Sequence, residues 1–358
     1  MKTLRILDWP KQRFYSETHP FYRWKNQFKE NGVEVSCHHQ HTDHTIRDAD
    51  YLIIHSRYFD MGWQNINTRN SENTEEVLAF LSDMRKSVKR LIWFDAADST
   101  GSHDFSIIPM VDVFLKKQVL KDKSYYTKKN NIRIWLNNQQ SENHINMFDP
   151  CPVSELHKIK VGWNIGLNDY RYFGYKMSRL SNYLSYALYP LSFSNVYQKR
   201  DLDLTFRGTI HKDWTGSYKV SEQRNKVLAY LDTTSLSVTK GPSVTKRKYW
   251  RELRNSKLCI SPYGWGEICY RDFEAFISGS LLVKPSMEHL DTYPNTFIAN
   301  ETYIPLPWDL GNLSDRLEDI IINNKFYKEI AMEGQQRYKA QVYDSQSFIE
   351  NIKKVIIE

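Results

Sequence analysis

The sequence predicts an α/β protein made of two doubly wound units in tandem, each a mostly parallel sheet with helices on both faces. Short apolar runs alternate with helical patterns through the first half of the chain, and the alternation begins again at Asp203. Strands that alternate with helices are typical of parallel sheets, because each parallel connection needs a crossover. The length of 358 residues suits two domains of roughly 100–200 residues each.

Five apolar runs in the first half are the expected strands. They are Leu4–Leu7, Val33–Cys37, Tyr51–His55, Leu91–Phe94 and Val111–Leu115. The continuous apolar character of Tyr51–His55 indicates a strand buried on both faces. Two helices are expected between the strands, His19–Glu30 and Glu75–Lys89. The first ends at Asn31-Gly32, and the second carries a single apolar stripe.

The second half repeats this pattern. Its expected strands are Leu204–Phe206, Leu236–Thr239, Leu258–Ile260 and Leu281–Val283. Its expected helices are Ser221–Asp232, Lys246–Ser256, Glu267–Ser278, Leu313–Asn323, Phe326–Gln341 and Phe348–Ile357. Ser221 is the expected N-cap of the first of these helices. Between the halves, Tyr175–Tyr189 is expected to form one helix followed by a linker, packed between the domains rather than lying on a membrane.

These elements divide the chain into three parts. We expect an N-terminal Rossmann-like domain at residues 1–195, a C-terminal Rossmann-like domain at residues 200–340, and a C-terminal helix at residues 341–358 that crosses back to the first domain. In open α/β sheets, ligands bind at the carboxyl ends of the strands, here in a cleft between the domains. The polar residues at those ends are therefore the candidates for function.

The segment Ser261–Glu274 follows a predicted strand and opens a predicted helix. Its candidate residues for binding a nucleotide are Tyr263, Gly264, Gly266, Glu267, Arg271 and Glu274. Glycines allow backbone amides to approach an anion, and a helix N-terminus adds partial positive charge. On a helix that begins at Glu267, the residues Glu267, Arg271 and Glu274 share one face. An arginine there can bind phosphate and a carboxylate can accept ribose hydroxyls, although a solvated face with an Arg–Glu pair gives the same spacing.

The same region resembles a known family. The run Tyr249–Pro285, including Arg271-Asp-Phe-Glu274-Ala, resembles the C-terminal nucleotide-sugar domain of exostosin-like and bacterial surface-polysaccharide glycosyltransferases. The motif Thr205-Phe-Arg207-Gly208-Thr, with Arg224 downstream, resembles the first loop and helix of that domain. The resemblance covers about residues 200–340 and implies the GT-B fold, in which two Rossmann-like domains face each other across a cleft.

The resemblance also implies roles for individual residues. The position that matches Glu274 binds the nucleotide ribose, and basic residues that match Arg207, Arg224 and Arg271 neutralise the diphosphate, with Lys284 as a further candidate. Gly208 belongs to the same donor site. No obligatory metal or other cofactor is implied, so cationic side chains and helix dipoles must stabilise the leaving diphosphate. Ordinary surface charge is the alternative for Arg224 and Lys284.

The acceptor is expected on the N-terminal domain. Retaining GT-B enzymes often carry two glutamates with seven residues between them, whereas Glu267 and Glu274 have six, which favours inversion. An inverting transfer needs a general base. Asp95 and Asp98 follow a predicted strand and are the candidates, with an Asx turn as the alternative. His55 ends a neighbouring strand, where it is expected to orient the acceptor or to satisfy a loop carbonyl.

Two other clusters were considered for ligand binding. Cys37–His44 contains four histidines, but its place on a strand end and loop favours a polar loop that contacts the acceptor or the diphosphate over a metal site. Lys116-Lys117 is expected either to bind an anionic acceptor or to be solvated. The four cysteines form no C-x-x-C pair, so no disulfide framework or zinc ribbon is expected.

These observations predict a glycosyltransferase that moves a sugar from a nucleotide-sugar donor to a glycan or lipid-linked glycan in the assembly of capsule or lipopolysaccharide. A sugar-nucleotide epimerase or hydrolase of the same fold is the alternative, followed by a non-catalytic module that binds glycan or nucleic acid. The net charge of +7 favours anionic partners. Because no signal peptide, membrane span or nucleic-acid motif is recognised, we expect a cytoplasmic protein, peripheral at an anionic inner membrane, with no nucleic-acid partner.

Overall fold

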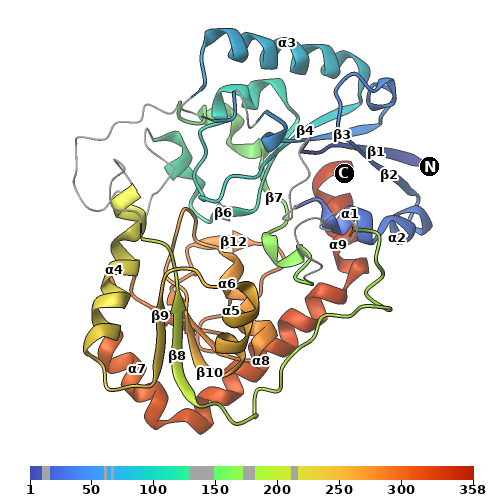
Figure 1. The fold of residues 1–358 in the computed structure, drawn as a ribbon. Coiled ribbons are helices and arrows are strands. Elements are labelled where there is room, and N and C mark those ends of the chain that lie inside the picture. The colour runs from blue at the N-terminus through green and yellow to red at the C-terminus, as the bar shows by residue number, and fades with distance from the viewer. Residues whose placement is uncertain (10–16, 60–62, 66–67, 129–148, 172–181, 211–216) are drawn as a thin grey trace.

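The computed structural model describes residues 1–9, 17–59, 63–65, 68–128, 149–171, 182–210 and 217–358. It is an α/β protein with two lobes, each built on a parallel sheet (Figure 1). The described N-terminal sheet has the order β2-β1-β3-β4-β5-β7, and the described C-terminal sheet has the order β13-β11-β10-β8-β9. All neighbouring strands in both sheets run parallel.

The nine strands predicted from the sequence match the structure within two residues at each end, whereas β7 and β13 were not predicted. Those of the N-terminal sheet are β1 (Lys2–Leu7), β2 (Val33–His38), β3 (Tyr51–His55), β4 (Arg90–Asp95), β5 (Val113–Lys116) and β7 (Ile159–Val161). Those of the C-terminal sheet are β8 (Leu202–Arg207), β9 (Val238–Gly241), β10 (Ser256–Ile260), β11 (Leu281–Pro285) and β13 (Ile304–Leu306). Every residue of β3 is buried, as its continuous apolar run predicts.

Helices cover the sheets. They are α1 (His19–Arg23), α2 (Lys25–Glu30), α3 (Ser71–Ser87), α4 (Ser217–Thr233), α5 (Lys246–Arg254), α6 (Tyr270–Ser278), α7 (Leu313–Ile322), α8 (Asn324–Tyr343) and α9 (Ser345–Ile352), the last continued by a π-helical turn at Lys353–Ile357. Short 3₁₀ turns occur at His44–Ile46, Ser56–Phe59, Phe105–Met110, Lys123–Thr127, Val153–Lys158 and Ile165–Leu167. No described helix has the length and apolarity needed to cross a membrane.

Several predicted helices differ from the structure. The predicted helix His19–Glu30 is two helices, α1 and α2, while α3 and α9 begin three or four residues earlier than predicted. α4 begins at Ser217, so Ser221 lies inside the helix and is fully buried rather than acting as an N-cap. α6 begins at Tyr270, because Asp272 accepts a hydrogen bond from the backbone amide of Cys269 and caps the helix there. The predicted helix Tyr175–Tyr189 lies partly outside the described residues, and its described part, 182–189, forms turns.

The C-terminal end of the chain packs on the N-terminal lobe. α8 runs along the C-terminal lobe, and α9 then lies beside α1 and α2 (Figure 1). Phe348 of α9 is 1% exposed and makes ring contacts with Phe21, Trp24 and Phe28. Ile349, Ile352 and Ile356 belong to the same buried cluster. The last helix therefore completes the core of the first lobe.

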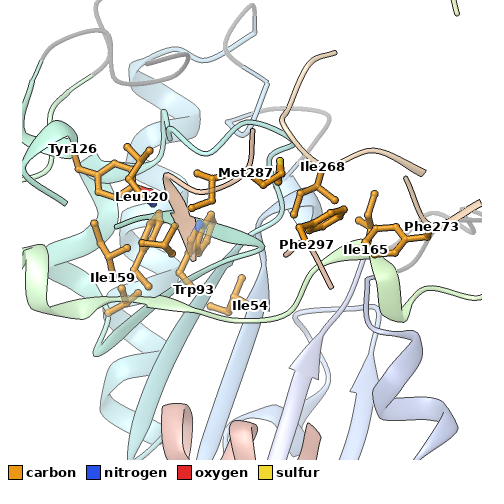
Figure 2. Packing of buried hydrophobic residues seen from close by; sticks show 14 of the residues in the cluster. Ile54, Trp93, Leu120, Tyr126, Ile159, Ile165, Ile268, Phe273, Met287 and Phe297 are labelled. Carbon is orange, nitrogen blue, oxygen red and sulfur yellow. Dashed lines mark hydrogen bonds between the residues drawn. The ribbon is translucent and has the colours of Figure 1, made fainter. Parts of the chain in front are cut away.

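The two lobes also share a hydrophobic core. β6 (Gln118–Leu120) of the first lobe pairs antiparallel with β12 (Leu290–Thr292) of the second. Above this pairing, Trp93 and Tyr126 belong to one continuous buried cluster with Ile268, Phe273 and Phe297 (Figure 2). The carboxyl ends of the two sheets are thus held at fixed positions relative to each other by apolar packing.

Candidate functional site

A pocket of about 360 Å³ lies in the C-terminal lobe, at the carboxyl ends of β8 and β9 and the N-terminal ends of α5 and α6. It is lined by Arg207, Ser243, Val244, Lys246, Tyr249, Cys269, Tyr270, Arg271 and Glu274. Three of the residues predicted for the donor site, Arg207, Arg271 and Glu274, are therefore brought together. This is the edge of a parallel sheet at which α/β proteins bind ligands.

The pocket is lined by cations at two helix N-termini. Arg207 is held in place by Glu252, whose carboxylate accepts two hydrogen bonds from the guanidinium at 2.8 and 2.9 Å. Arg271 donates through Nη2 to the backbone oxygen of Arg207 at 2.7 Å, while its Nη1 has no hydrogen-bond partner among the described residues. Lys246 lies at the first turn of α5, and burial lowers its pKa although Glu274 partly offsets this effect. The arrangement suits an anion with several oxygens.

Glu274 is the acidic residue of this basic pocket. Its Oε2 accepts a hydrogen bond from the hydroxyl of Tyr249 at 2.7 Å, and its Oε1 has no hydrogen-bond partner in the described part of the chain. Burial raises the pKa of Glu274, and the hydrogen bond from Tyr249 and the charge of Lys246 oppose that rise only in part. A carboxylate fixed through one oxygen can accept hydroxyl protons from a ligand with the other.

Three further predicted donor residues, Arg224, Gly264 and Gly208, lie close to the pocket lining. Arg224 donates to the backbone oxygen of Thr209 at 2.7 Å, and a Cβ added at Gly264 would come within 2.6 Å of its Nη2. Burial and the charge of Arg271 both lower the pKa of Arg224, which indicates that the two guanidiniums are near each other. Gly208 packs against the ring of Phe206, where an added Cβ would come within 2.9 Å. Gly264 and Gly208 therefore permit close packing.

Two predicted donor residues are buried in the C-terminal core, and their assignment is corrected. Lys284 is fully buried, with its Nζ 2.6 Å from a carboxylate oxygen of Asp272 and 2.8 Å from the backbone oxygen of Glu267. Tyr263 is 1% exposed and donates its hydroxyl to the backbone oxygen of Ser286. Lys284 thus fixes the strand-to-helix loop and does not face a diphosphate.

Glu267 and Gly266 belong to the contact between the lobes rather than to the donor site. Glu267 is 2% exposed, precedes α6, and accepts the backbone N–H of Thr100 at 3.0 Å. It therefore does not continue the helical face of Arg271 and Glu274 as predicted. A Cβ added at Gly266 would lie 1.7 Å from the backbone oxygen of Asp98, so only glycine permits this approach of the two loops.

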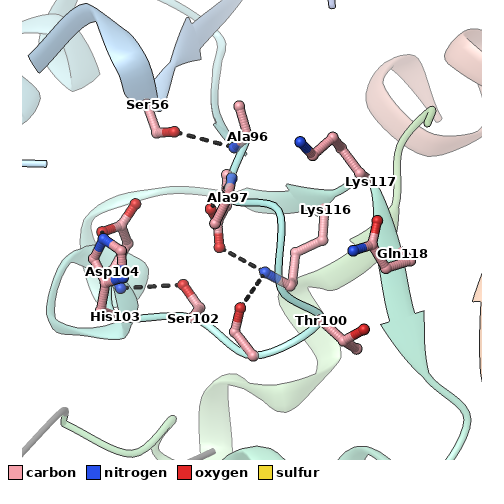
Figure 3. Close-up of polar contacts among 12 residues, drawn as sticks. Ser56, Ala96, Ala97, Thr100, Ser102, His103, Asp104, Lys116, Lys117 and Gln118 are labelled. Atoms are coloured by element: carbon pink, nitrogen blue, oxygen red, sulfur yellow. Dashed lines mark hydrogen bonds and ion pairs between the residues drawn. The ribbon is translucent and has the colours of Figure 1, made fainter. Parts of the chain in front are cut away.

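Asp95 is wrong as a candidate base. Its side chain is 1% exposed and forms an ion pair with Lys116, whose Nζ lies 2.6 Å from the carboxylate and also donates to the backbone oxygen of Gly101 (Figure 3). The carboxylate also accepts the backbone N–H of Ala97, the Asx turn considered as the alternative. Lys116 is 1% exposed, so neither partner faces solvent or a substrate.

Asp98 presents a carboxylate at the same sheet edge. Its side chain is 49% exposed, and its Oδ1 lies 2.9 Å from Nζ of Lys117 and 3.3 Å from Nη2 of Arg57. Its Oδ2 has no hydrogen-bond partner among the residues that the structure describes. Partial desolvation alone would raise the pKa of Asp98, but the charges of Lys117 and Arg57 hold it below its usual value. Asp98 is therefore an oriented carboxylate with one oxygen accessible.

Behind Asp98 lies a buried group of polar residues. His55 is 1% exposed, with its Nε2 3.3 Å from Oε2 of Glu17 and its ring stacked with that of Trp9 at 6.5 Å between centroids. Lys117 is 4% exposed and lies 3.5 Å from Oε1 of Glu17, so it is neither solvated nor open to an anionic acceptor, contrary to both predictions. His55 is a buried residue that supports the site and does not line its surface.

Several of these functional candidates escaped the sequence analysis. Lys246 and Tyr249 could have been found, since they lie on the first turns of a predicted helix in the region of family resemblance. Glu17, Arg57 and Trp9 gave no signal, because each lies in an irregular segment whose position depends on the tertiary fold.

The histidine-rich segment Cys37–His44 is a hydrogen-bonded loop. The ring of His38 binds Asp43 at 2.6 Å and Ser36 at 2.6 Å, and His41 binds the hydroxyl of Tyr58. Among the described residues, no group of three or more side chains is arranged to hold a metal ion. The segment is thus a polar loop, and its predicted contact with an acceptor or a diphosphate stays a prediction.

No protein-family model matches the sequence, and no curated protein matches it. Solved structures do match over the whole chain. An α-glucosyltransferase in complex with UDP and a 13-mer DNA containing an HMU base is 12% identical, with 99% of each chain covered and a TM-score of 0.51. Anabaena HepE in complex with UDP and glucose is 9% identical with a TM-score of 0.46, and the DNA-modifying enzyme β-glucosyltransferase is 11% identical with a TM-score of 0.48, again with 99% of each chain covered.

The first of these likenesses confirms the predicted GT-B fold. The likeness does not confirm the resemblance to exostosin-like or surface-polysaccharide glycosyltransferases. It also corrects the expectation that nucleic acid is not a partner, because a protein of this fold is solved in complex with DNA. The absence of a recognised nucleic-acid motif is therefore no ground for that exclusion.

Proposed function

We propose that the protein is a glycosyltransferase that binds a nucleotide-sugar donor in the pocket of the C-terminal lobe. The observation that carries this proposal is the convergence of Arg207, Lys246 and Arg271 with Glu274 at the N-terminal ends of α5 and α6. The same edge of the sheet binds nucleotides in doubly wound folds. The shared fold with an α-glucosyltransferase solved with UDP supports the proposal.

Each group in the pocket has a part in donor binding. The diphosphate lies against the α6 N-terminus and Arg271, whose unsatisfied Nη1 supplies a donor. Glu274 accepts the ribose hydroxyls through Oε1, while Tyr249 holds Oε2. As the bond between the sugar and the diphosphate breaks, the cations of the pocket stabilise the charge that develops on the leaving oxygen, so no metal is required.

Asp98 is the proposed base. The acceptor oxygen forms a bond to the anomeric carbon while the bond to the diphosphate breaks, and the hydroxyl proton passes to Oδ2 of Asp98. Lys117 and Arg57 hold Oδ1 and so aim the free oxygen outward. The backbone of Asp98 lies against Gly266, in the loop that leads directly into α6 of the donor pocket. A single displacement of this kind inverts the anomeric configuration.

The proposed acceptor is a glycan or lipid-linked glycan of bacterial surface polysaccharide. The family resemblance of residues 200–340 and the net charge of +7 support an acceptor of this kind at an anionic membrane surface. Measurement of nucleotide release with and without added acceptor separates transfer from hydrolysis. Release that is equally fast without any acceptor would favour the hydrolase alternative.

DNA is a second candidate acceptor. α5 presents exposed basic residues, Arg247, Arg251 and Arg254, along its outer face, and its first turn lines the donor pocket. A protein of the same fold is solved with DNA. If DNA is the acceptor, affinity for a duplex should fall steeply with salt, and the Arg247→Ala, Arg251→Ala double variant should make that dependence shallower. Salt-independent or undetectable binding of the duplex would exclude this acceptor.

A thermal-shift titration with UDP and UDP-glucose tests the donor site. A ligand present at 100 times its Kd stabilises the folded protein by about 2.7 kcal/mol. We expect Arg271→Ala and Glu274→Ala to abolish the shift, because they remove the anion and ribose contacts. The matched control Arg254→Ala changes an exposed arginine outside the pocket and should keep it.

The base is tested in the same variants by turnover. Asp98→Asn should bind the donor with an unchanged thermal shift and lose turnover, whereas Asp95→Asn should destabilise the fold by breaking its buried pair with Lys116. A donor shift that survives in both pocket variants, or a fully active Asp98→Asn, would contradict the proposed site.

A further inference from the structure

Lys117 lies between two carboxylates, one accessible and one buried. Its Nζ is 2.9 Å from Oδ1 of Asp98 and 3.5 Å from Oε1 of Glu17. Lys117 and Glu17 are each 4% exposed at the side chain, whereas Asp98 is 49% exposed. One buried cation therefore forms ion pairs with both a surface carboxylate and an internal carboxylate.

We propose that Glu17 is a positioning residue that divides the charge of Lys117 between two carboxylates and so preserves the strength of Asp98 as a base. This inference rests on the proposed function of Asp98 in glycosyl transfer. Without Glu17, Lys117 would interact with Asp98 alone and would lower the pKa of Asp98 further. With Glu17 present, Lys117 still orients Oδ1, but the second negative charge offsets part of its effect.

Glu17 is equipped to stay ionised in this position. Burial alone would raise the pKa of Glu17, but the charge of Lys117 and the hydrogen bond with His55 lower that pKa well below its usual value. Arg57 contributes in the same direction. Glu17 is therefore a fixed negative charge at neutral pH and does not compete with Asp98 for the proton of the acceptor.

The charges that act on Asp98 come from every side of the cluster. Lys117 follows β5, Arg57 lies in the 3₁₀ turn after β3, and Glu17 precedes α1. The charge of Glu17 raises the pKa of Asp98, opposite in sign to those of the two cations. Across the lobe contact, Glu267 accepts one hydrogen bond from the backbone N–H of Thr100, and its Oε2 lies 3.5 Å from Nε2 of Gln118. Among the described residues, the charges that shift the pKa of Asp98 are thus those of two cations, Lys117 and Arg57, and of one buried anion, Glu17.

Carboxyl ¹³C NMR of the protein labelled at aspartate tests the inference without any substrate. Asp98→Asn assigns the resonance of Asp98, whose titration midpoint is then followed against pH. Glu17→Gln keeps the size of the side chain but removes its charge, so the midpoint of Asp98 should fall below that of the wild type. Lys117→Gln should move the midpoint in the opposite direction. If Glu17→Gln does not fold, Glu17→Asp carries the test: it keeps the charge but draws it away from Lys117, so the midpoint of Asp98 should fall by less than in Glu17→Gln but still below that of the wild type. Glu34→Gln, an exposed glutamate on β2, should leave it unchanged.

An Asp98 midpoint that stays the same in Glu17→Gln would overturn the inference, as would a midpoint that rises. The release of UDP from UDP-glucose, measured from pH 4 to pH 9, gives the second readout. Its acidic limb should move to lower pH in Glu17→Gln, together with the midpoint of Asp98. If the midpoint of Asp98 falls in Glu17→Gln but the protein neither binds nor cleaves UDP-glucose, the role of Glu17 is supported and the proposed function is not. Failure of the inference and failure of the proposed function therefore give different results.

Discussion

At the scale of single residues, Glu274, the proposed ribose-binding carboxylate, is expected to reduce the stability of the protein that carries it. Burial raises its pKa above the ordinary value of 4.5, so the folded state holds the proton more tightly than the unfolded state does. The stabilising contribution of this carboxyl is complete below pH 4.5 and is lost as the pH rises through the folded pKa. At neutral pH the ionised group therefore disfavours folding until a ligand donates hydrogen bonds to it.

The upward shift of the Glu274 pKa leads to a prediction for Glu274→Gln. The variant should be more stable than the wild type at pH 7 by a margin that shrinks towards pH 4, because the protonated carboxyl and the amide are both neutral. Urea midpoints measured between pH 4 and pH 8 check the trend, with Glu288→Gln as a control at an exposed position. The same variant should lose donor affinity. A margin that grows as the pH falls would contradict the cause assigned to the pKa shift.

The residues of the proposed donor pocket also show what sequence can and cannot predict. Arg271 and Glu274 could be predicted because helical spacing and family resemblance both placed them on one face of a helix after a strand. Glu267 and Gly266 lie only a few residues earlier, but their roles depend on Thr100 and Asp98 of the other lobe. Contacts between distant segments leave no local pattern, so burial and pairing of these residues required the structure.

At the scale of elements, α9 is predictable as a helix, but the residues that it meets follow only from the fold. Its apolar positions give a helical period, and the C-terminal crossing to the first lobe places Phe348 among the rings of α1 and α2. Ring pairs of this kind stabilise a core beyond the area that they bury. The helix therefore contributes to the stability of a lobe that begins more than 300 residues earlier in the chain.

Truncation of this contact should be costly. We expect Phe348→Ala to lower the free energy of unfolding by about 3–5 kcal/mol, because it leaves a cavity in the first lobe. Phe326→Ala is the matched control, since that ring is 58% exposed on α8 and should change stability by less than about 0.5 kcal/mol. Equilibrium unfolding in urea measures both variants. Equal effects would show that α9 does not belong to the core of the lobe.

At the scale of the whole molecule, the two lobes are joined by more than a linker. β6 pairs with β12, Glu267 accepts the backbone N–H of Thr100, and Trp93 and Phe273 belong to one buried cluster. A two-lobed protein whose lobes met only through polar surfaces would unfold each lobe separately. Here the apolar core is continuous across the boundary, so melting of either lobe exposes buried surface of the other.

We therefore predict that the described lobes unfold in a single cooperative transition. Differential scanning calorimetry should give a calorimetric enthalpy about equal to the van't Hoff enthalpy, whereas two independent lobes would give a ratio of about two. Phe273→Ala, which removes a ring from the shared cluster, should lower the transition temperature and broaden or split the peak. Phe326→Ala on the outer face of α8 should leave the peak single. Two resolved peaks in the wild type would mean that the two lobes unfold independently. The contact between Asp98 and the loop of Gly266 would then not fix one lobe relative to the other.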